Sequence, residues 1–200
     1  SKIIDHLIAA CDIPQATGFG VPGQTLPHPR DFINSRDIQP GEILYIDDIR
    51  ISCCENTHYR PEDQFGKQGP ISLSYRFDAP DRSMVFTGDT GPCLALEEFA
   101  KNADLLVGEL FDTELVINRL RATNPDMSDH ALLQMRQHFD EHHLTPEDLG
   151  QLASRAGVKK VVAVHIPFIT KSAEEDAKYV SRILAKFSGS VTISEDLAAY

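Results

Sequence analysis

The chain has 200 residues, 42% hydrophobic and 24% charged, a balance typical of a soluble globular protein. Its formal net charge of −11 disfavours a general nucleic-acid surface, which needs Lys and Arg to neutralise phosphates. No apolar stretch approaches a membrane span, and residues 1–10 lack the layout of a signal peptide, so we expect no membrane partner. The four cysteines are too few for a disulfide framework, which favours a reducing, cytoplasmic compartment, although a signal peptide upstream of Ser1 would change that.

The first half of the chain is predicted to be rich in β-structure. Residues 2–10 have the pattern of the end of an amphipathic helix, and residues 14–29, with their scattered Gly and Pro, that of a loop. Residues 43–46 and 49–54 predict a hairpin that turns at 47–48. Residues 71–77 alternate apolar with polar side chains as a half-buried strand does, and 84–86 predict the next strand.

Helices and strands are predicted to alternate after Pro92. Apolar spacing predicts helices over 94–100, 127–139, 145–157 and 173–187, and strands over 105–107, 161–164 and 191–193. A β-rich half followed by alternating units indicates layered α/β architecture, and we expect residues 1–200 to form one domain. Cys53 and Cys54 are interpreted as strand filler, with a role as soft metal ligands as the alternative.

Three potential metal ligands follow three predicted strands. Strand 84–86 leads to Asp89 in a turn-rich loop, strand 49–54 leads toward His58, and strand 161–164 ends directly on His165. Proteins of the α/β class place binding groups at strand ends, and imidazole with carboxylate suits zinc, with manganese or iron as alternatives. We favour this interpretation over two structural ones, an Asx-turn for Asp89 and a backbone hydrogen bond for His58.

Four segments, in the same order, resemble motifs of the metallo-β-lactamase superfamily, especially its ribonuclease Z-like and arylsulfatase-like hydrolases. Residues 87–90, Thr-Gly-Asp-Thr, resemble its metal-bridging aspartate motif, and residues 55–59, Glu-Asn-Thr-His-Tyr, an upstream ligand histidine. Residues 143–147 and 156–165 resemble its closing pair, an accessory histidine and then the last ligand. The resemblance runs from about Gly41 to Asp196 and implies an αββα sandwich.

The resemblance also implies a function and roles for the site residues. It implies a hydrolase that cleaves a phosphodiester, sulfate ester or lactone with a metal-bound hydroxide, using two ions, zinc by preference. Asp89 would bridge the ions, and His58 and His165 would complete their ligand shells. His143 would be catalytic, stabilising the substrate oxyanion or leaving group. Glu109, at the end of strand 105–107, would orient a histidine, with an exposed strand-end glutamate as the alternative.

One family hallmark is missing. A His-x-His-x-Asp-His loop occurs nowhere in these residues, and its natural place would precede Ser1. We expect the chain to be the carboxy-terminal two-thirds of such a domain, inactive by itself; the alternative is a non-catalytic binding or scaffold module of the same fold.

Substrate and partner expectations follow from spacing and charge. Only 30 residues separate His58 from Asp89, which leaves no room for the long tRNA-clasping arm of many ribonuclease Z enzymes. We therefore expect a small anionic or ester substrate, disfavour nucleic acid, and leave a homo-oligomer open. His138 and His142, four positions apart, could chelate metal on a helix, but a solvated helix face is the favoured interpretation.

Overall fold

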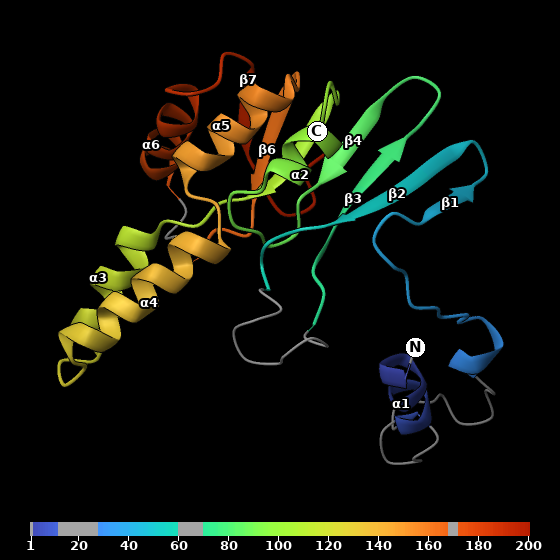
Figure 1. Ribbon diagram of the computed structural model, residues 1–200, viewed down its shortest axis with the longest axis horizontal. Helices are drawn as coiled ribbons and strands as arrows, with labels where there is room; N and C mark the ends of the chain where they lie inside the picture. The colour runs from blue at the N-terminus through green and yellow to red at the C-terminus, as the bar shows by residue number, and fades with distance from the viewer. Residues whose placement is uncertain (1, 12–27, 60–69, 168–171) are drawn as a thin grey trace. The chain divides into compact units, whose positions relative to one another are not determined.

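The computed structural model describes residues 2–11, 28–59, 70–167 and 172–200 (Figure 1). The chain divides into two compact units, residues 1–39 and 40–200. In the first unit, α1 (Lys2–Ala10) confirms the predicted helix, and most of the predicted loop 14–29 lies outside the described residues. A short 3-10 helix, η1 (Pro29–Asp31), begins where the His28 side chain accepts a hydrogen bond from the backbone N–H of Arg30.

The second unit is built on one seven-stranded sheet, in which the strands follow one another in chain order. The first four strands pair antiparallel, and β4 to β7 pair parallel. The carboxyl ends of β4, β5 and β6 therefore meet at one edge, as the sequence predicted for the segments that lead to Asp89 and His165. The strands are β1 (Ile43–Ile46), β2 (Ile49–Glu55), β3 (Leu73–Asp78), β4 (Ser83–Phe86), β5 (Leu105–Glu109), β6 (Lys160–Val164) and β7 (Ser190–Ile193).

Three helices pack against one face of this sheet: α2 (Leu94–Phe99), α5 (Pro146–Ala156) and α6 (Ala173–Leu184) (Figure 1). Register places Val85, Leu106 and Val161 side by side on that face, each completely buried. Gly108 permits the close approach of α5, since a Cβ there would lie 2.5 Å from Cδ1 of Leu149. Burying apolar surface between these layers supplies the main stabilising term, and it holds β4, β5 and β6 in fixed positions relative to one another.

The end signals of α5 match the sequence prediction. Thr145 accepts a hydrogen bond from the backbone N–H of Asp148, whose carboxylate accepts from Thr145 in return. Pro146 occupies the first turn, where a missing N–H costs nothing, and Gly157 ends the helix with a φ of 67°. These local signals are worth about 1 kcal/mol each, and they fix the point at which the chain enters β6.

A helical hairpin, α3 (Thr113–Thr123) and α4 (Asp129–His142), projects from the sheet edge (Figure 1). The sequence patterns predicted α4 but no element over 113–123. The missed signal is Asp112, which accepts a hydrogen bond from the backbone N–H of Leu115 and so begins α3. Arg182 of α6 donates both to Asp112 and to Glu147, where it lowers the pKa of the Glu147 carboxyl. The base of the hairpin is thereby tied to the helical layer.

The opposite face of the sheet is apolar and only partly covered. Phe77 of β3 and Phe86 of β4 pack edge to face with ring centroids 5.6 Å apart, and Phe86 is still 40% exposed. The predicted α/β class is confirmed, and the described residues supply one sheet and one helical layer of the predicted four-layer sandwich. Within the part of the chain that the structure describes, no helix has the length and apolar character to cross a bilayer.

Candidate metal centre

The four histidine and aspartate residues singled out in the sequence come together at one sheet edge. Suitable donor atoms of His58, Asp89 and His143 all lie within 4.8 Å of one another. His165 joins them through Asp89, because its Nε2 lies 3.6 Å from Asp89 Oδ2. The structure therefore places the predicted ligands and the predicted catalytic histidine in one cluster, although they span 107 positions of the chain.

A buried asparagine fixes the loop of His58 against the loop of Asp89. Asn56 is 4% exposed, and its Nδ2 donates to Ser74 Oγ at 3.2 Å and to the carbonyl oxygen of Thr87 at 3.0 Å. Its Oδ1 accepts from the backbone N–H of His58 at 3.1 Å. One amide thus connects the ends of β2, β3 and β4, which holds His58 and Asp89 in place before any ion binds.

Glu109 connects the aspartate loop to His143. This carboxylate is 2% exposed, and its Oε1 accepts from the backbone N–H of Thr90 in the aspartate loop. Its Oε2 lies 2.8 Å from Nδ1 of His143. Because a carboxylate accepts, Nδ1 of His143 carries the proton and Nε2 is left to face the cluster. The sequence alternative of an exposed strand-end glutamate is wrong, and the histidine that Glu109 orients is His143.

The His143 ring is also fixed by stacking. It lies on Phe111 with ring centroids 4.5 Å apart and an interplanar angle of 21°, and it meets the His58 ring edge to face at 5.0 Å. Phe111 is held in turn, since its backbone N–H donates to the carbonyl oxygen of Leu144 at 2.7 Å. A ring fixed on one face and at one nitrogen can present its other nitrogen in a single direction.

His142 is buried at 5% exposure, so the predicted solvated face is wrong for this residue. Its Nδ1 lies 2.7 Å from the carbonyl oxygen of His58, and Nδ1 of His58 lies 3.2 Å from the carbonyl oxygen of His142. Both carbonyls can only accept, which places the His58 proton on Nδ1 and leaves its Nε2 for a ligand. The His138 residue is exposed overall, and partial desolvation of its imidazole, followed by repulsion from His142, His143 and His58, lowers its pKa.

His165 adopts a conformation that few side-chain-bearing residues accept. It directly follows β6 with a φ of 52°, in the left-handed region, and its side chain is 62% exposed. A non-glycine residue in that region costs about 1 kcal/mol or more, and such strain is concentrated at functional sites. In this conformation Nε2 of His165 lies 3.6 Å from Asp89 Oδ2.

The donor set fits a divalent transition metal. Two or three imidazole nitrogens and one carboxylate are the ligands that zinc accepts, and the ring protons of His58 and His143 are already placed away from the cluster. The sequence analysis identified three of these donors, His58, Asp89 and His165, because each follows a predicted strand. Asn56 and Phe111 were missed, and His142 was interpreted as part of a solvated face, because each acts through a tertiary contact that leaves no local signal.

Gly91 allows the aspartate loop to approach α4. A Cβ at this position would lie 1.9 Å from the carbonyl oxygen of Glu141, a contact that forces the backbone apart. We expect Gly91→Ala to lower the free energy of unfolding by about 2 kcal/mol or more, as overpacking against backbone does. Urea unfolding would measure it, with Leu94→Ala on the exposed side of α2 as the control. A Gly91→Ala protein as stable as the control would contradict this close approach.

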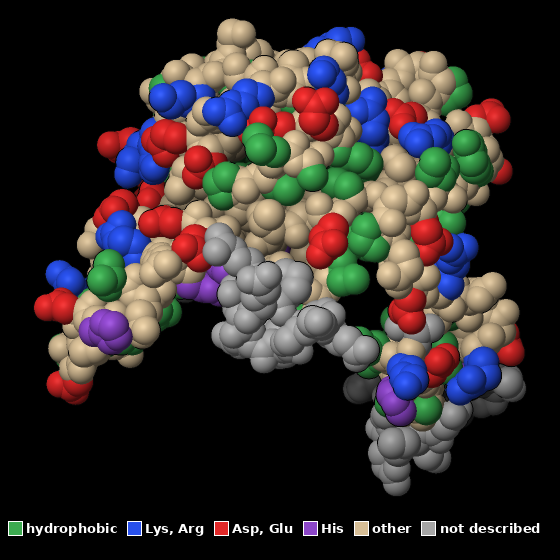
Figure 2. Space-filling view, viewed as in Figure 1, with side chains coloured by type: hydrophobic (Ala, Val, Ile, Leu, Met, Phe, Trp, Pro, Cys, Tyr) green, Lys and Arg blue, Asp and Glu red, His purple; other side chains and the backbone are tan. Residues whose placement is uncertain are grey.

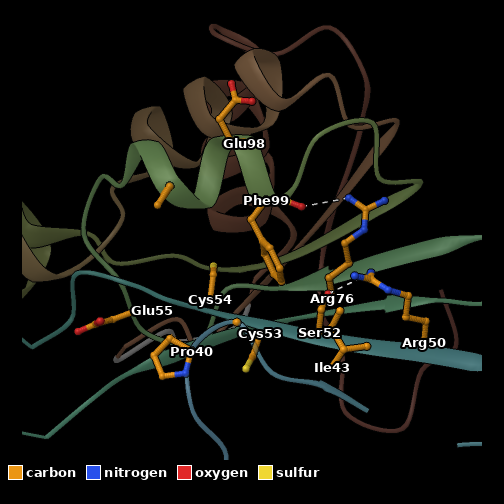
Figure 3. Close-up of a pocket in the computed structure, with 12 residues that line it drawn as sticks. Pro40, Ile43, Arg50, Ser52, Cys53, Cys54, Glu55, Arg76, Glu98 and Phe99 are labelled. Atoms are coloured by element: carbon orange, nitrogen blue, oxygen red, sulfur yellow. Dashed lines mark hydrogen bonds between the residues drawn. The ribbon is translucent and has the colours of Figure 1, made fainter. Parts of the chain in front are cut away.

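A larger cavity lies elsewhere, between α2 and strands β1 to β3, with a volume of about 690 Å³ (Figure 3). Arg50 and Arg76 point into it from the sheet, but both already bond to Asp78. Cys54, on its floor, is held as a thiol because burial raises its pKa to about 12. Both arginines are already paired and the thiol of Cys54 is unreactive, so this cavity offers less chemistry than the cluster at the strand ends.

Comparison with known proteins identifies the family. The model of the beta-lactamase superfamily domain matches residues 15–166, more than half of the chain. The chain therefore belongs to the metallo-β-lactamase superfamily, whose members are metal-dependent hydrolases and whose fold implies metal binding. The ribonuclease Z-like character predicted from the motifs is also supported, since a ribonuclease Z of Mycobacterium avium is 30% identical over 127 residues, 63% of this chain and 40% of that protein.

Solved structures agree on the fold. The metallo-beta-lactamase fold protein YhfI from Bacillus subtilis superposes with a TM-score of 0.54 at 18% identity, covering 79% of this chain and 52% of that one. A putative metal-dependent hydrolase from Parabacteroides distasonis gives 0.51 at 13% identity, covering 81% and 58%. The chain spans about two-fifths of the length of the Mycobacterium avium relative.

Proposed function

We propose that the full-length protein is a metal-dependent hydrolase of an ester-type bond, with phosphodiesters as the leading substrate class over sulfate esters and lactones. The observation that carries the proposal is the convergence of His58, Asp89, His143 and His165 at one sheet edge. Similarity to ribonuclease Z supports the phosphodiester class. The family hallmark His-x-His-x-Asp-His loop is absent from these 200 residues, and the proposal assigns the remaining ligands and the general base to the length of its relatives that this chain does not span.

His58, Asp89 and His165 would hold the metal, and two ions are proposed because Asp89 has a histidine near it from each of two separate loops. Its donor atom lies within 4.8 Å of that of His58, and Nε2 of His165 lies 3.6 Å from Asp89 Oδ2. A carboxylate has two oxygens that can accept, so it could serve two ions. Bound ions would supply Lewis acidity and an activated water, with zinc preferred and manganese or iron as alternatives.

His143 would hold a proton for the oxygen that departs from the substrate. Glu109 accepts from Nδ1, so Nε2 is the nitrogen that faces the reacting groups. Phe111 beneath the ring keeps the imidazole from turning away. In this proposal Glu109 and Phe111 are positioning residues, and His143 is the catalytic residue that touches the substrate.

Removal and return of metal tests the proposal. We expect the full-length protein, after chelation, to lose hydrolysis of bis(p-nitrophenyl) phosphate and to regain it with zinc, manganese or iron, because the ions activate both water and the ester. Assays of p-nitrophenyl sulfate and a lactone beside it would rank the three ester classes, and elemental analysis would count the ions. Hydrolysis unaffected by chelation would contradict the metal mechanism.

A non-catalytic module of the same fold is the second candidate, because the hallmark loop is absent from the chain. Full-length protein that retains no metal and hydrolyses none of the three ester classes would favour that candidate.

A further inference from the structure

The imidazole of His142 bonds to the chain segment that carries His58. Its Nδ1 lies 2.7 Å from the carbonyl oxygen of His58 and 3.2 Å from that of Thr57. Carbonyl oxygens can only accept, so Nδ1 of His142 carries a proton and donates to both. In return, Nδ1 of the His58 ring lies 3.2 Å from the carbonyl oxygen of His142. The two histidines are therefore joined in both directions, although they are 84 positions apart in the chain.

The last turn of α4 gives His142 a fixed position from which to act. The backbone N–H of His143 donates to the carbonyl oxygen of Phe139 and closes this turn. Gly91, in the aspartate loop, lies so close to the turn that a Cβ there would be 3.2 Å from the backbone nitrogen of His142. The turn thus contacts both the aspartate loop and the segment of His58, and His142 is buried at 5% exposure.

His142 supplies two of the three hydrogen bonds that hold His58. The backbone N–H of His58 donates to Oδ1 of Asn56, its carbonyl oxygen accepts from the His142 ring, and its own Nδ1 donates to the His142 backbone. A ring that is fixed at one nitrogen and along its backbone presents the other nitrogen in one direction. Without the donor of His142, the carbonyl side of this segment would be released, and Nδ1 of His58 would lose its fixed distance from its acceptor.

We propose that His142 is a positioning residue for the metal ligand His58. Its Nδ1–H holds the backbone at residues 57–58, so that the His58 ring keeps its proton on Nδ1 and offers Nε2 to the ion. The inference rests on the proposed function for the role of His58 as a ligand, and His142 acts through His58 instead of binding the ion. Figure 2 shows histidine side chains over the α3–α4 hairpin, both near its base and further out. Burial and donation to the His58 segment distinguish His142 from the exposed His130 of the same helix.

Substitution of His142 in the full-length protein separates hydrogen bonding from the space that the ring fills. His142→Leu fills much of this space without a donor, and it should weaken zinc binding by about 10- to 100-fold, as loss of a group that orients a ligand does. His142→Asn should keep the affinity within about threefold of wild type, because an amide N–H can replace the Nδ1–H. Competition with a chromogenic chelator measures these affinities. His130→Leu, the same change at an exposed position of α4, should leave the affinity unchanged.

Nitrogen NMR of the metal-free protein, with isotope-labelled histidine rings, reports the tautomer of His58. We expect the Nδ1–H form in the wild type and in His142→Asn, and a mixture of both tautomers in His142→Leu. A variant His142→Leu that is less stable but keeps the wild-type tautomer and zinc affinity would make His142 merely structural and overturn the inference. If His142→Leu does not fold, the other two proteins decide. A wild-type His58 protonated on Nε2, or a loss of about tenfold or more in the zinc affinity of His142→Asn, overturns the inference.

Hydrolysis assays distinguish failure of this inference from failure of the proposed function. If the wild type hydrolyses esters in a metal-dependent manner and a well-folded His142→Leu binds zinc as the wild type does, the positioning role is refuted and the hydrolase stands. If no ester is hydrolysed but His142→Leu weakens zinc binding and His142→Asn does not, the positioning role stands and the hydrolase does not.

Discussion

Replacing Asp89 with alanine in the full-length protein should remove most of the bound metal and nearly all hydrolysis. Asp89 is the donor that lies close to all the others, within 4.8 Å of His58 and His143 and 3.6 Å from His165. Losing a shared ligand should lower kcat/KM by a factor on the order of 10³ or more, since bound ions contribute several kcal/mol to such reactions. Elemental analysis and turnover of bis(p-nitrophenyl) phosphate would measure both losses.

The fold should survive this change. The Asp89 side chain is 37% exposed, and the loop around it is held by Asn56, Glu109 and Thr90 instead. Asp81→Ala, which removes an exposed carboxylate from the β3–β4 turn, is the matched control and should keep full metal content. A well-folded Asp89→Ala protein with unchanged turnover would refute the assignment of Asp89 as a ligand.

Substitution of the two closing histidines should separate their roles. The Nε2 atom of His143 can either bind an ion or hold a proton for the substrate, and the proposed function requires the second. His143→Ala should then keep the metal and lower kcat by about 10²–10³, as loss of one charge-stabilising donor does. His165→Ala should instead lower the metal content, because its Nε2 faces Asp89 at 3.6 Å.

Elemental analysis of both variants beside wild type decides between these roles. His130→Ala, an exposed histidine of α4, controls for the loss of an imidazole and should change neither quantity. Equal metal loss in both closing variants would make His143 a ligand, which its place within 4.8 Å of His58 and Asp89 permits sterically. Full metal retention in both would remove His165 from the ligand set.

The elements of the second unit could be predicted wherever local signals act alone. Thr145, Pro146 and Gly157 mark the ends of α5 by their own hydrogen bonding and backbone preferences, and the prediction there was confirmed. The stretch 113–123 was missed because Leu115, Val116 and Ile117 form a continuous apolar run, which does not distinguish a helix from a strand. The cap at Asp112 is the local feature that decides for a helix.

Some residues of the candidate site could likewise be predicted from the sequence, and others could not. Asp89 and His165 could be found from the sequence because each follows an apolar strand, and parallel strands bring their carboxyl ends together. The contact between Glu109 and His143 joins residues 34 positions apart, so the sequence does not reveal it. The tautomer of the His143 ring is inferred from the 2.8 Å distance between its Nδ1 and Oε2 of Glu109. Exposure of the far sheet face and the partition into two units likewise depend on packing, which a single sequence does not display.

The change from antiparallel to parallel pairing at β4 also bears on the order in which the parts of the site form during folding. Strands β3 and β4 pair across a turn of a few residues, so Asp89 belongs to a part of the sheet with short chain closures. Leu105 of β5 pairs with Lys160 of β6, 55 positions further on. This pairing closes a long loop of chain that contains α3 and α4. Long closures cost more chain entropy and form more slowly. We therefore expect His143 and His165 to reach Asp89 late in folding, so that the four donors come together only when the parallel half of the sheet has formed.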